Sequence, residues 1–168
     1  ANLRQPYNGT DQVQAYADYR SSPAGGQYKV LLLDMEEVYQ RFGYGDRNPM
    51  AIRNLGGYFV QNNVKPKGLF LLGKGLGVNN RLNAAYWNTN YIPTFGTPPS
   101  DNAFAIGLGE QGKGIAFPVG RLAAWNAKQV SDYLRKVKEN ESFKYDDLWK
   151  KNVFHISGGL NKMEQAAF

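Results

Sequence analysis

The glycine-rich stretch around 69–72 is the first place in this sequence to look for chemistry. Gly68-x-x-x-x-Gly73-Lys74 has the opening spacing of a P-loop. A P-loop uses the four intervening residues to hold phosphate, whereas here they are Leu-Phe-Leu-Leu, which predict a strand, and Gly75 replaces the serine or threonine that binds Mg²⁺. Gly73-x-Gly75-x-Gly77 fails as a dinucleotide fingerprint, because Val78 stands where the third glycine belongs. A nucleotide-binding α/β domain, testable by calorimetry with ATP and NAD, remains a minor hypothesis, and we expect no cofactor.

The side chains that usually carry acid–base or nucleophilic chemistry are scarce. His155 is the only histidine, and its apolar surroundings indicate a structural role. Glu36 and Glu37 are adjacent, so on a helix they point about 100° apart and cannot share a proton. Cysteine is absent, which excludes disulfides, thiolate metal sites and a cysteine nucleophile within these residues. One histidine with scattered acids does not predict a metal site.

A long polar and aromatic segment, residues 76–100, is the most distinctive loop. Loops of this length in compact domains are usually functional lids or surface wraps. Its rings predict a binding surface of Tyr86, Trp87 and Tyr91. Asp101 and Arg121 fall at loop–strand junctions, and we expect structural roles for both, because a charge-assisted hydrogen bond at such a junction can fix the long loop in place.

Composition excludes several classes of protein. The 168 residues suit one domain with its own core, with 42% hydrophobic and 20% charged residues. The net charge of +6 does not cluster as nucleic-acid binding requires, since the densest basic run, 135–138, lies in a predicted helix followed by Glu139 and Glu141. No apolar run approaches the roughly 20 residues of a membrane helix, so we expect no membrane insertion.

The order of elements predicts an α/β fold. Apolar runs predict strands at 28–33, 69–72, 103–108, 115–119 and 152–156, and apolar periodicity predicts helices at about 11–20, 35–42, 49–62 and 126–139. Thr10 or Asp11, and later Asn48 and Asn126, are predicted helix caps. The pair Gly56-Gly57 inside the third helix indicates close packing on the sheet.

The run Leu69–Leu72 lacks polar alternation, which is typical of a central strand buried on both faces. We therefore expect one domain, 1–168, built as a three-layer α/β sandwich: a mainly parallel sheet of about four to six strands flanked by helices. Ligands of such sheets bind at the carboxyl ends of the strands, which here is the edge after Gly73.

Several motifs closely resemble gingipain-type cysteine peptidases, in the family's order and over roughly residues 12–168. They are Tyr28-Lys-Val-Leu-Leu-Leu-Asp-Met-Glu-Glu-Val-Tyr39, Phe42-Gly-Tyr-Gly45, Pro49-x-Ala-Ile-Arg53, Leu69-Phe-Leu-Leu-Gly73, Ile92-Pro-Thr-Phe-Gly-Thr-Pro-Pro-Ser-Asp101, Phe117-Pro-Val-Gly-Arg-Leu122, residues 130–138, and Trp149-Lys-Lys-Asn-Val-Phe-His-Ile-Ser-Gly-Gly159. The sequence is most similar to Bacteroidetes surface peptidases tied to type IX secretion.

This resemblance implies a caspase-like fold of two subdomains that cleaves peptide bonds through a histidine–cysteine dyad. It implies that the chain is the first, non-catalytic subdomain, that the dyad follows in a second subdomain of the same polypeptide, and that the substrate is a protein or peptide. His155 does not match the family's catalytic histidine. The active-site edge is then expected near Ser157, Gly158 and Gly159, in a protein that is secreted, periplasmic or on the bacterial surface.

Two positions depart from the family's pattern. Lys74 stands where the family usually has aspartate, and Ser157 stands where gingipains have the glutamate that supports the catalytic histidine. Another acid such as Glu164, or a backbone carbonyl, is an alternative support, and an inactive or differently tuned parent enzyme stays open. The alternative function is a non-catalytic interaction module that binds through the aromatic loop.

Overall fold

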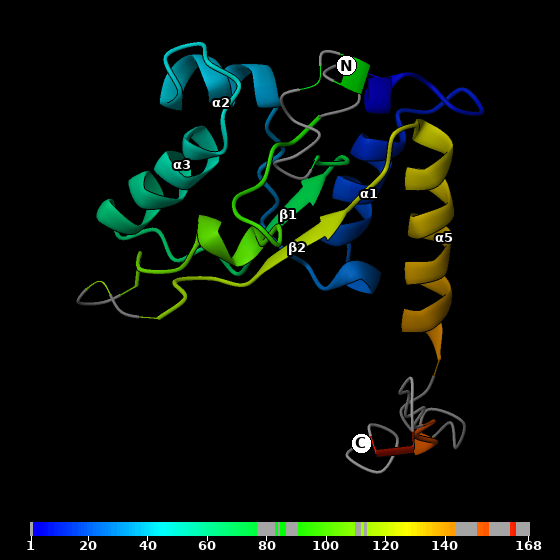
Figure 1. Ribbon diagram of the computed structural model, residues 1–168. Coiled ribbons are helices and arrows are strands. Elements are labelled where there is room, and N and C mark those ends of the chain that lie inside the picture. The colour runs from blue at the N-terminus through cyan, green and yellow to red at the C-terminus, as the bar shows by residue number, and fades with distance from the viewer. Residues whose placement is uncertain are drawn as a thin grey trace.

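The computed structural model describes residues 2–76, 83, 85–86, 91–109, 112, 114–143, 151–154 and 162–163. Within them lie two parallel strands, β1 (Leu69–Leu72) and β2 (Val119–Leu122), with helices on both faces (Figure 1). This arrangement confirms the expected α/β class with a helix-flanked parallel sheet. The sequence predicted four to six strands, and the described residues contain two.

The two strands are in register from Leu69 opposite Val119 to Leu72 opposite Leu122. Because side chains alternate along a strand, the odd and even positions face opposite layers. Leu71 belongs to one buried cluster with Ile52, whereas Leu72 packs against a different cluster. The strands are therefore covered on both faces, as the unbroken apolar run predicted.

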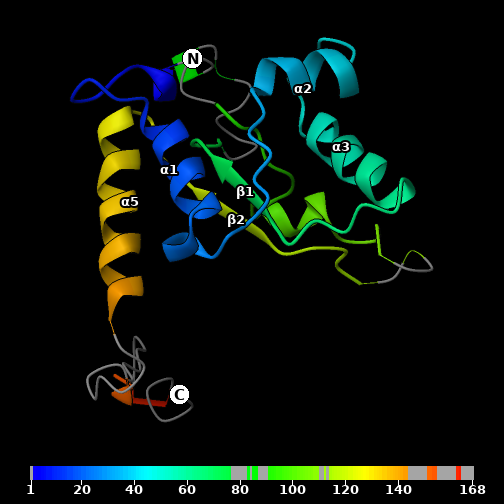
Figure 2. The same ribbon diagram turned by 180° about the vertical axis from the view of Figure 1, so that it is seen from behind.

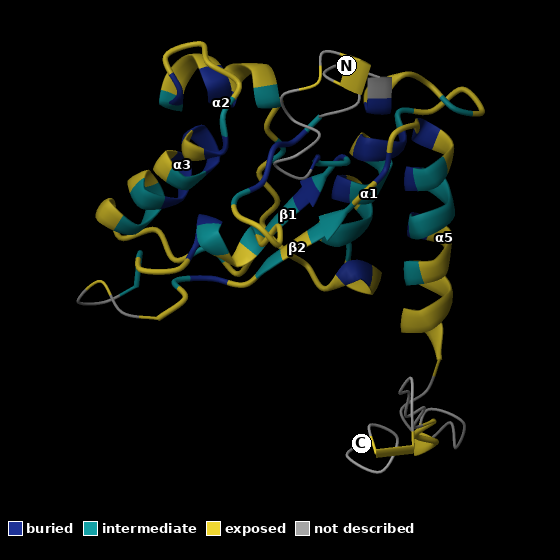
Figure 3. Ribbon diagram, viewed as in Figure 1, coloured by how far each residue is buried: buried dark blue, intermediate teal, exposed yellow. Residues whose placement is uncertain are grey.

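One layer consists of α2 (Met35–Phe42) and α3 (Pro49–Gln61), together with the short 3-10 helix η4 (Asp101–Phe104). The other consists of α1 (Gln12–Ser21) and α5 (Ala127–Ser142). There Phe70 of β1 forms a three-ring cluster with Tyr16 and Tyr133, at centroid distances of 5.3 and 5.7 Å. Figure 2 shows α1 and α5 side by side from behind, and Figure 3 shows buried residues where the helices face the strands.

The helices confirm the predictions made from local sequence. Asp11, not Thr10, caps α1 by accepting hydrogen bonds from the backbone of Val13 and Gln14. Asn48 caps α3 ahead of a proline at the first helical position, and Asn126 caps α5. These signals are readable from sequence because a cap needs only residues within one turn of it.

Gly56 of α3 confirms the expected close packing, although its neighbours belong to loops and η4, not to the sheet. A Cβ there would lie 2.9 Å from Phe117 Cζ and 3.4 Å from the carbonyl oxygen of Phe104. At Gly57 the nearest such atom is a Leu108 methyl carbon at 3.9 Å. Only the first glycine is required by packing.

Several strand predictions are wrong. Residues 28–33 are not a strand and lie largely exposed, with Leu31 64% accessible. The Tyr28 N–H donates to Arg20 O of α1, and no strand in the described residues pairs with this segment. Residues 103–108 begin inside η4 instead, and the strand placed at 115–119 occurs later, at 119–122. Of 152–156, the described residues 152–154 are not a strand, and Val153 and Phe154 are over 90% exposed.

These errors share a cause. An apolar run fits a strand only where a second backbone lies alongside to pair with it and cover it, and local sequence does not say where that happens. In the described part of the chain, no helix combines the length and the apolar character needed to cross a bilayer.

Candidate functional site

The candidate site is the edge at which both parallel strands end. Gly73 follows β1 with φ +149, and a Cβ there would meet Tyr91 and Ile92 side-chain atoms at 3.0–3.1 Å. At Gly75 a Cβ would lie 2.7 Å from the Ile92 carbonyl oxygen. These glycines therefore allow segment 91–92 to lie directly against the strand's end.

Arg121 of β2 is the central side chain of this edge. Its Nε and Nη2 donate to the two carboxylate oxygens of Asp101 at 2.7 and 2.8 Å. Its Nη1 donates to the carbonyl oxygens of Gly73 and Ile92 at 2.8 and 2.9 Å. One guanidinium thus joins the end of β1, the segment at 92 and the helix η4. The sequence indicated structural roles for Asp101 and Arg121 separately, without pairing them.

The carboxylate of Asp101 is held in its charged form. Burial by itself would raise the pKa of Asp101, but the hydrogen bonds and positive charge of Arg121 outweigh it and lower that pKa below its usual value. The hydroxyl of Thr94 adds a third hydrogen bond, at 3.0 Å. The pair is mostly buried, with the Arg121 side chain 13% exposed.

Lys74 lies beside this network. Its ammonium sits over the indole of Trp125, 4.6 Å from the ring centroid, which is a favourable cation–π geometry. Its backbone N–H donates to Ala124 O at 3.0 Å, and its carbonyl accepts from the backbone of Tyr91 and Ile92. The lysine therefore ties the chain after β1 to the chain after β2.

A small cavity of about 170 Å³ opens at this edge. It is lined by Gly75, Thr94, Pro99, Asp101, Arg121 and Ala123. Its charged groups are already bonded to one another, and no nucleophilic thiol exists in the sequence. The arrangement can position loops and present a rigid edge.

The other sequence-predicted residues are distributed as follows. Tyr86 is 45% exposed, whereas Tyr91 is half-buried and its hydroxyl donates to Trp125 O at 3.3 Å. Glu36 is exposed and paired with Arg47 at the start of α2. The residues that lie outside the described part of the chain are Trp87, His155, Ser157, Gly158, Gly159 and Glu164.

Three participants were not predicted from sequence: Thr94, Trp125 and the carbonyl of Ile92. A hydroxyl beside Pro93 and an aromatic just after a strand were visible signals, but carbonyl acceptors have no side-chain signature. In the described ranges, no group of three or more histidine, cysteine, aspartate or glutamate residues is placed to hold a metal ion.

Comparison with known proteins gives one match. The model of Peptidase family C25 matches residues 5–167. No curated protein and no solved structure matches the chain.

Proposed function

Because the chain belongs to peptidase family C25, the gingipain family, we propose that it is the non-catalytic N-terminal subdomain of a secreted, gingipain-like cysteine endopeptidase. The observation that carries this proposal is a family match across 5–167 in a sequence without cysteine. A thiol peptidase needs a thiolate nucleophile. In this proposal the histidine and cysteine are supplied by polypeptide that follows residue 168.

The role of these residues is then to support the active-site edge. Reacting groups must be held within about 1 Å of their productive positions, since larger errors cost roughly 100-fold in rate. The Arg121–Asp101 pair supports this role, because it joins both strand ends and η4 with short, charge-assisted hydrogen bonds. The substrate is a protein or peptide, and the enzyme acts at the bacterial surface or beyond it.

The lysine at position 74, where the family usually has aspartate, fits an active-site edge whose charge differs from that of the family. Where the family usually carries an acid, this chain places an ammonium against Trp125. The positive charge lies at the carboxyl ends of the strands, where it bears on any group that approaches this edge. In this proposal, the full-length enzyme is active only if the polypeptide after residue 168 carries the cysteine nucleophile.

The test compares the 168-residue chain with the same polypeptide extended through the next subdomain. The chain alone is expected to hydrolyse no peptide. The extended protein is expected to hydrolyse peptides and to be labelled by a thiol-directed inhibitor at one cysteine per molecule. In the matched control, the reactive cysteine of the extended protein is substituted by alanine. Hydrolysis by the chain alone, or an extension that contains no cysteine, would refute the proposal.

The alternative function is an interaction module, and the exposure of Tyr86 favours it. Tyr86→Ala is expected to weaken capture of a protein or glycan partner, whereas the control Tyr28→Ala, at an exposed ring far from that loop in sequence, is not. Equal capture by both variants would contradict binding through the aromatic loop.

A further inference from the structure

Lys74 and Trp125 meet at the carboxyl edge of the sheet, in the two segments that follow β1 and β2 (Figure 1). The Lys74 ammonium lies 4.6 Å from the centroid of the indole ring. Lys74 is half-buried, whereas Trp125 is 49% exposed. The ammonium thus occupies one part of the ring, and about half of the surface of the tryptophan stays accessible to a ligand.

The backbone holds both residues in place before any ligand binds. The Trp125 N–H donates to Gln129 Oε1 at 2.9 Å, and the Trp125 carbonyl accepts from the Tyr91 hydroxyl at 3.3 Å. The Lys74 N–H donates to Ala124 O at 3.0 Å, and the Lys74 carbonyl accepts from the backbone of Tyr91. Because groups that are already ordered lose little freedom on binding, this lysine and this ring form a prearranged pair.

The sequence around this pair contains no acidic residue. Residues 111–131, which include β2 and Trp125, have neither aspartate nor glutamate. Residues 47–100 have none either, and their basic residues are Arg47, Arg53, Lys65, Lys67, Lys74 and Arg81. Neither of the segments that follow the two strands can therefore supply a carboxylate to the Lys74 ammonium.

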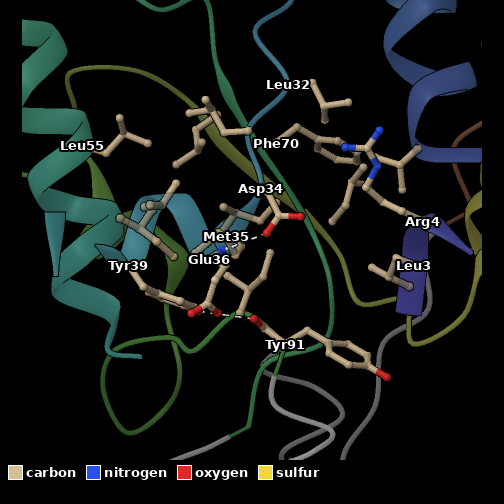
Figure 4. Close-up of a pocket in the computed structure, with 18 of the residues that line it drawn as sticks. Leu3, Arg4, Leu32, Asp34, Met35, Glu36, Tyr39, Leu55, Phe70 and Tyr91 are labelled. Atoms are coloured by element: carbon tan, nitrogen blue, oxygen red, sulfur yellow. Dashed lines mark hydrogen bonds between the residues drawn. The ribbon is translucent and has the colours of Figure 1, made fainter. Parts of the chain in front are cut away.

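The acidic side chains that approach this edge from elsewhere are already engaged. Both carboxylate oxygens of Asp101 accept from Arg121. Asp34 lines the cavity of about 470 Å³ beside β1, which Lys74 does not line, and its carboxylate accepts the backbone N–H of Glu36 at 2.9 Å (Figure 4). In the part of the chain that the structure describes, no carboxylate forms an ion pair with Lys74. The edge therefore presents a positive charge whose observed partner is an indole ring.

We propose that Lys74 and Trp125 form a substrate subsite that binds a peptide carboxylate. This inference rests on the proposed function, because it makes the edge one wall of the cleft in which the peptidase holds its substrate. An ammonium attracts a carboxylate, and the accessible indole surface offers an apolar contact to the methylene groups that precede it. A glutamate side chain has both groups. A lysine in the same place is repelled, and a glutamine gains only the contact with the ring.

The test measures binding to the 168-residue chain, which needs no catalytic thiol. NMR titrations follow the indole N–H of Trp125, whose signal is assigned with Trp125→Phe. The peptides are acetyl-Ala-Ala-Glu-Ala-Ala-amide, the same peptide with glutamine, and the glutamine peptide with a free C-terminal carboxylate. The glutamate peptide is expected to bind about 5-fold more tightly than the blocked glutamine peptide at low salt, and high salt should remove the difference. The third peptide shows whether a C-terminal carboxylate is accepted as well as a side chain.

Variants at position 74 separate this role from a purely structural one. Lys74→Gln should remove the preference for glutamate, and Lys74→Glu should reverse it in favour of a peptide with a central lysine. The matched control, Lys67→Gln, removes an exposed lysine of the same acid-free segment at the opposite end of β1, and it should keep the preference. A contact that only stabilised the fold would change the melting temperature without changing the ratio between the peptides.

Equal binding of the glutamate and blocked glutamine peptides by the wild-type chain would overturn the subsite, and so would an unchanged preference in Lys74→Gln. Cleavage by the extended polypeptide distinguishes this inference from the proposed function. If glutamate and glutamine peptides are cleaved with equal kcat/KM, the subsite is refuted and the peptidase stands. If the extended polypeptide cleaves no peptide while the 168-residue chain still prefers glutamate, the peptidase is refuted and the carboxylate site stands as a binding site.

Discussion

Arg121 and Asp101 meet in a two-pronged ion pair, Nε to Oδ2 at 2.7 Å and Nη2 to Oδ1 at 2.8 Å. The pair links a strand to a short helix twenty residues earlier. The remaining guanidinium nitrogen is occupied by two carbonyl oxygens, so substitution leaves several polar groups without a partner.

Arg121→Ala is expected to lower the free energy of unfolding by about 3 kcal/mol, because the Asp101 carboxylate then stays largely buried and unpaired. Arg121→Lys should recover little, since an ammonium cannot reproduce the planar fork. Urea unfolding measures both changes. The matched control, Arg135→Ala, breaks an exposed pair within α5 and should cost no more than about 0.5 kcal/mol. Equal costs for Arg121→Ala and the control would contradict the assigned role.

The same pair makes stability sensitive to acid. The pKa of Asp101 is lowered in the folded protein, so near the usual aspartate value of 3.8 unfolding takes up a proton. The contribution of Asp101 is therefore full above that pH and is lost as the pH falls through the lower, folded pKa. The difference in unfolding free energy between wild type and Asp101→Asn should shrink over this acidic range. A difference that is constant with pH would contradict the lowered pKa.

Gly56 and Gly57 offer a matched pair in one helix. Gly56→Ala should destabilise the protein by about 1–2 kcal/mol, because the new methyl group would overlap the buried ring of Phe117. Gly57→Ala should instead stabilise it by up to about 1 kcal/mol through helix propensity, since its nearest neighbour is 3.9 Å away. Thermal unfolding of the two variants checks the opposite signs, and the same sign for both would contradict the packing.

The hydroxyl of Tyr39 in α2 should ionise at a higher pH than an ordinary tyrosine. Burial raises the pKa of Tyr39 to about 12, with Arg47 opposing the shift. Because the folded state holds this proton more tightly, the contribution is full below pH 10 and is lost as the pH rises toward 12. Ultraviolet absorbance of tyrosinate should show a component with a midpoint near 12 that Tyr39→Phe removes. Its persistence in the variant would assign that component to another tyrosine.

Local sequence determined the helices of this protein. Asp11, Asn48 and Asn126 cap helices within one turn of themselves, and Pro49 fixes the first helical position of α3, so no distant residue is needed to place these boundaries. The apolar run 69–72 likewise determined a strand buried on both faces. The sequence marked Asp101 and Arg121 as structural residues at loop–strand junctions, but it did not show that they pair with each other.

Tertiary structure decided the rest, because hydrogen-bond partners in a sheet lie far apart in sequence. Two runs of similar apolar character, 28–33 and 69–72, have different outcomes, since only the second lies beside β2. The carbonyl acceptors of Arg121 and the cavity beside β1 have no sequence pattern, because both arise only where separate segments come together. Local sequence therefore determined the helices and their caps, and the packed chain decided which apolar runs are buried and which backbones pair.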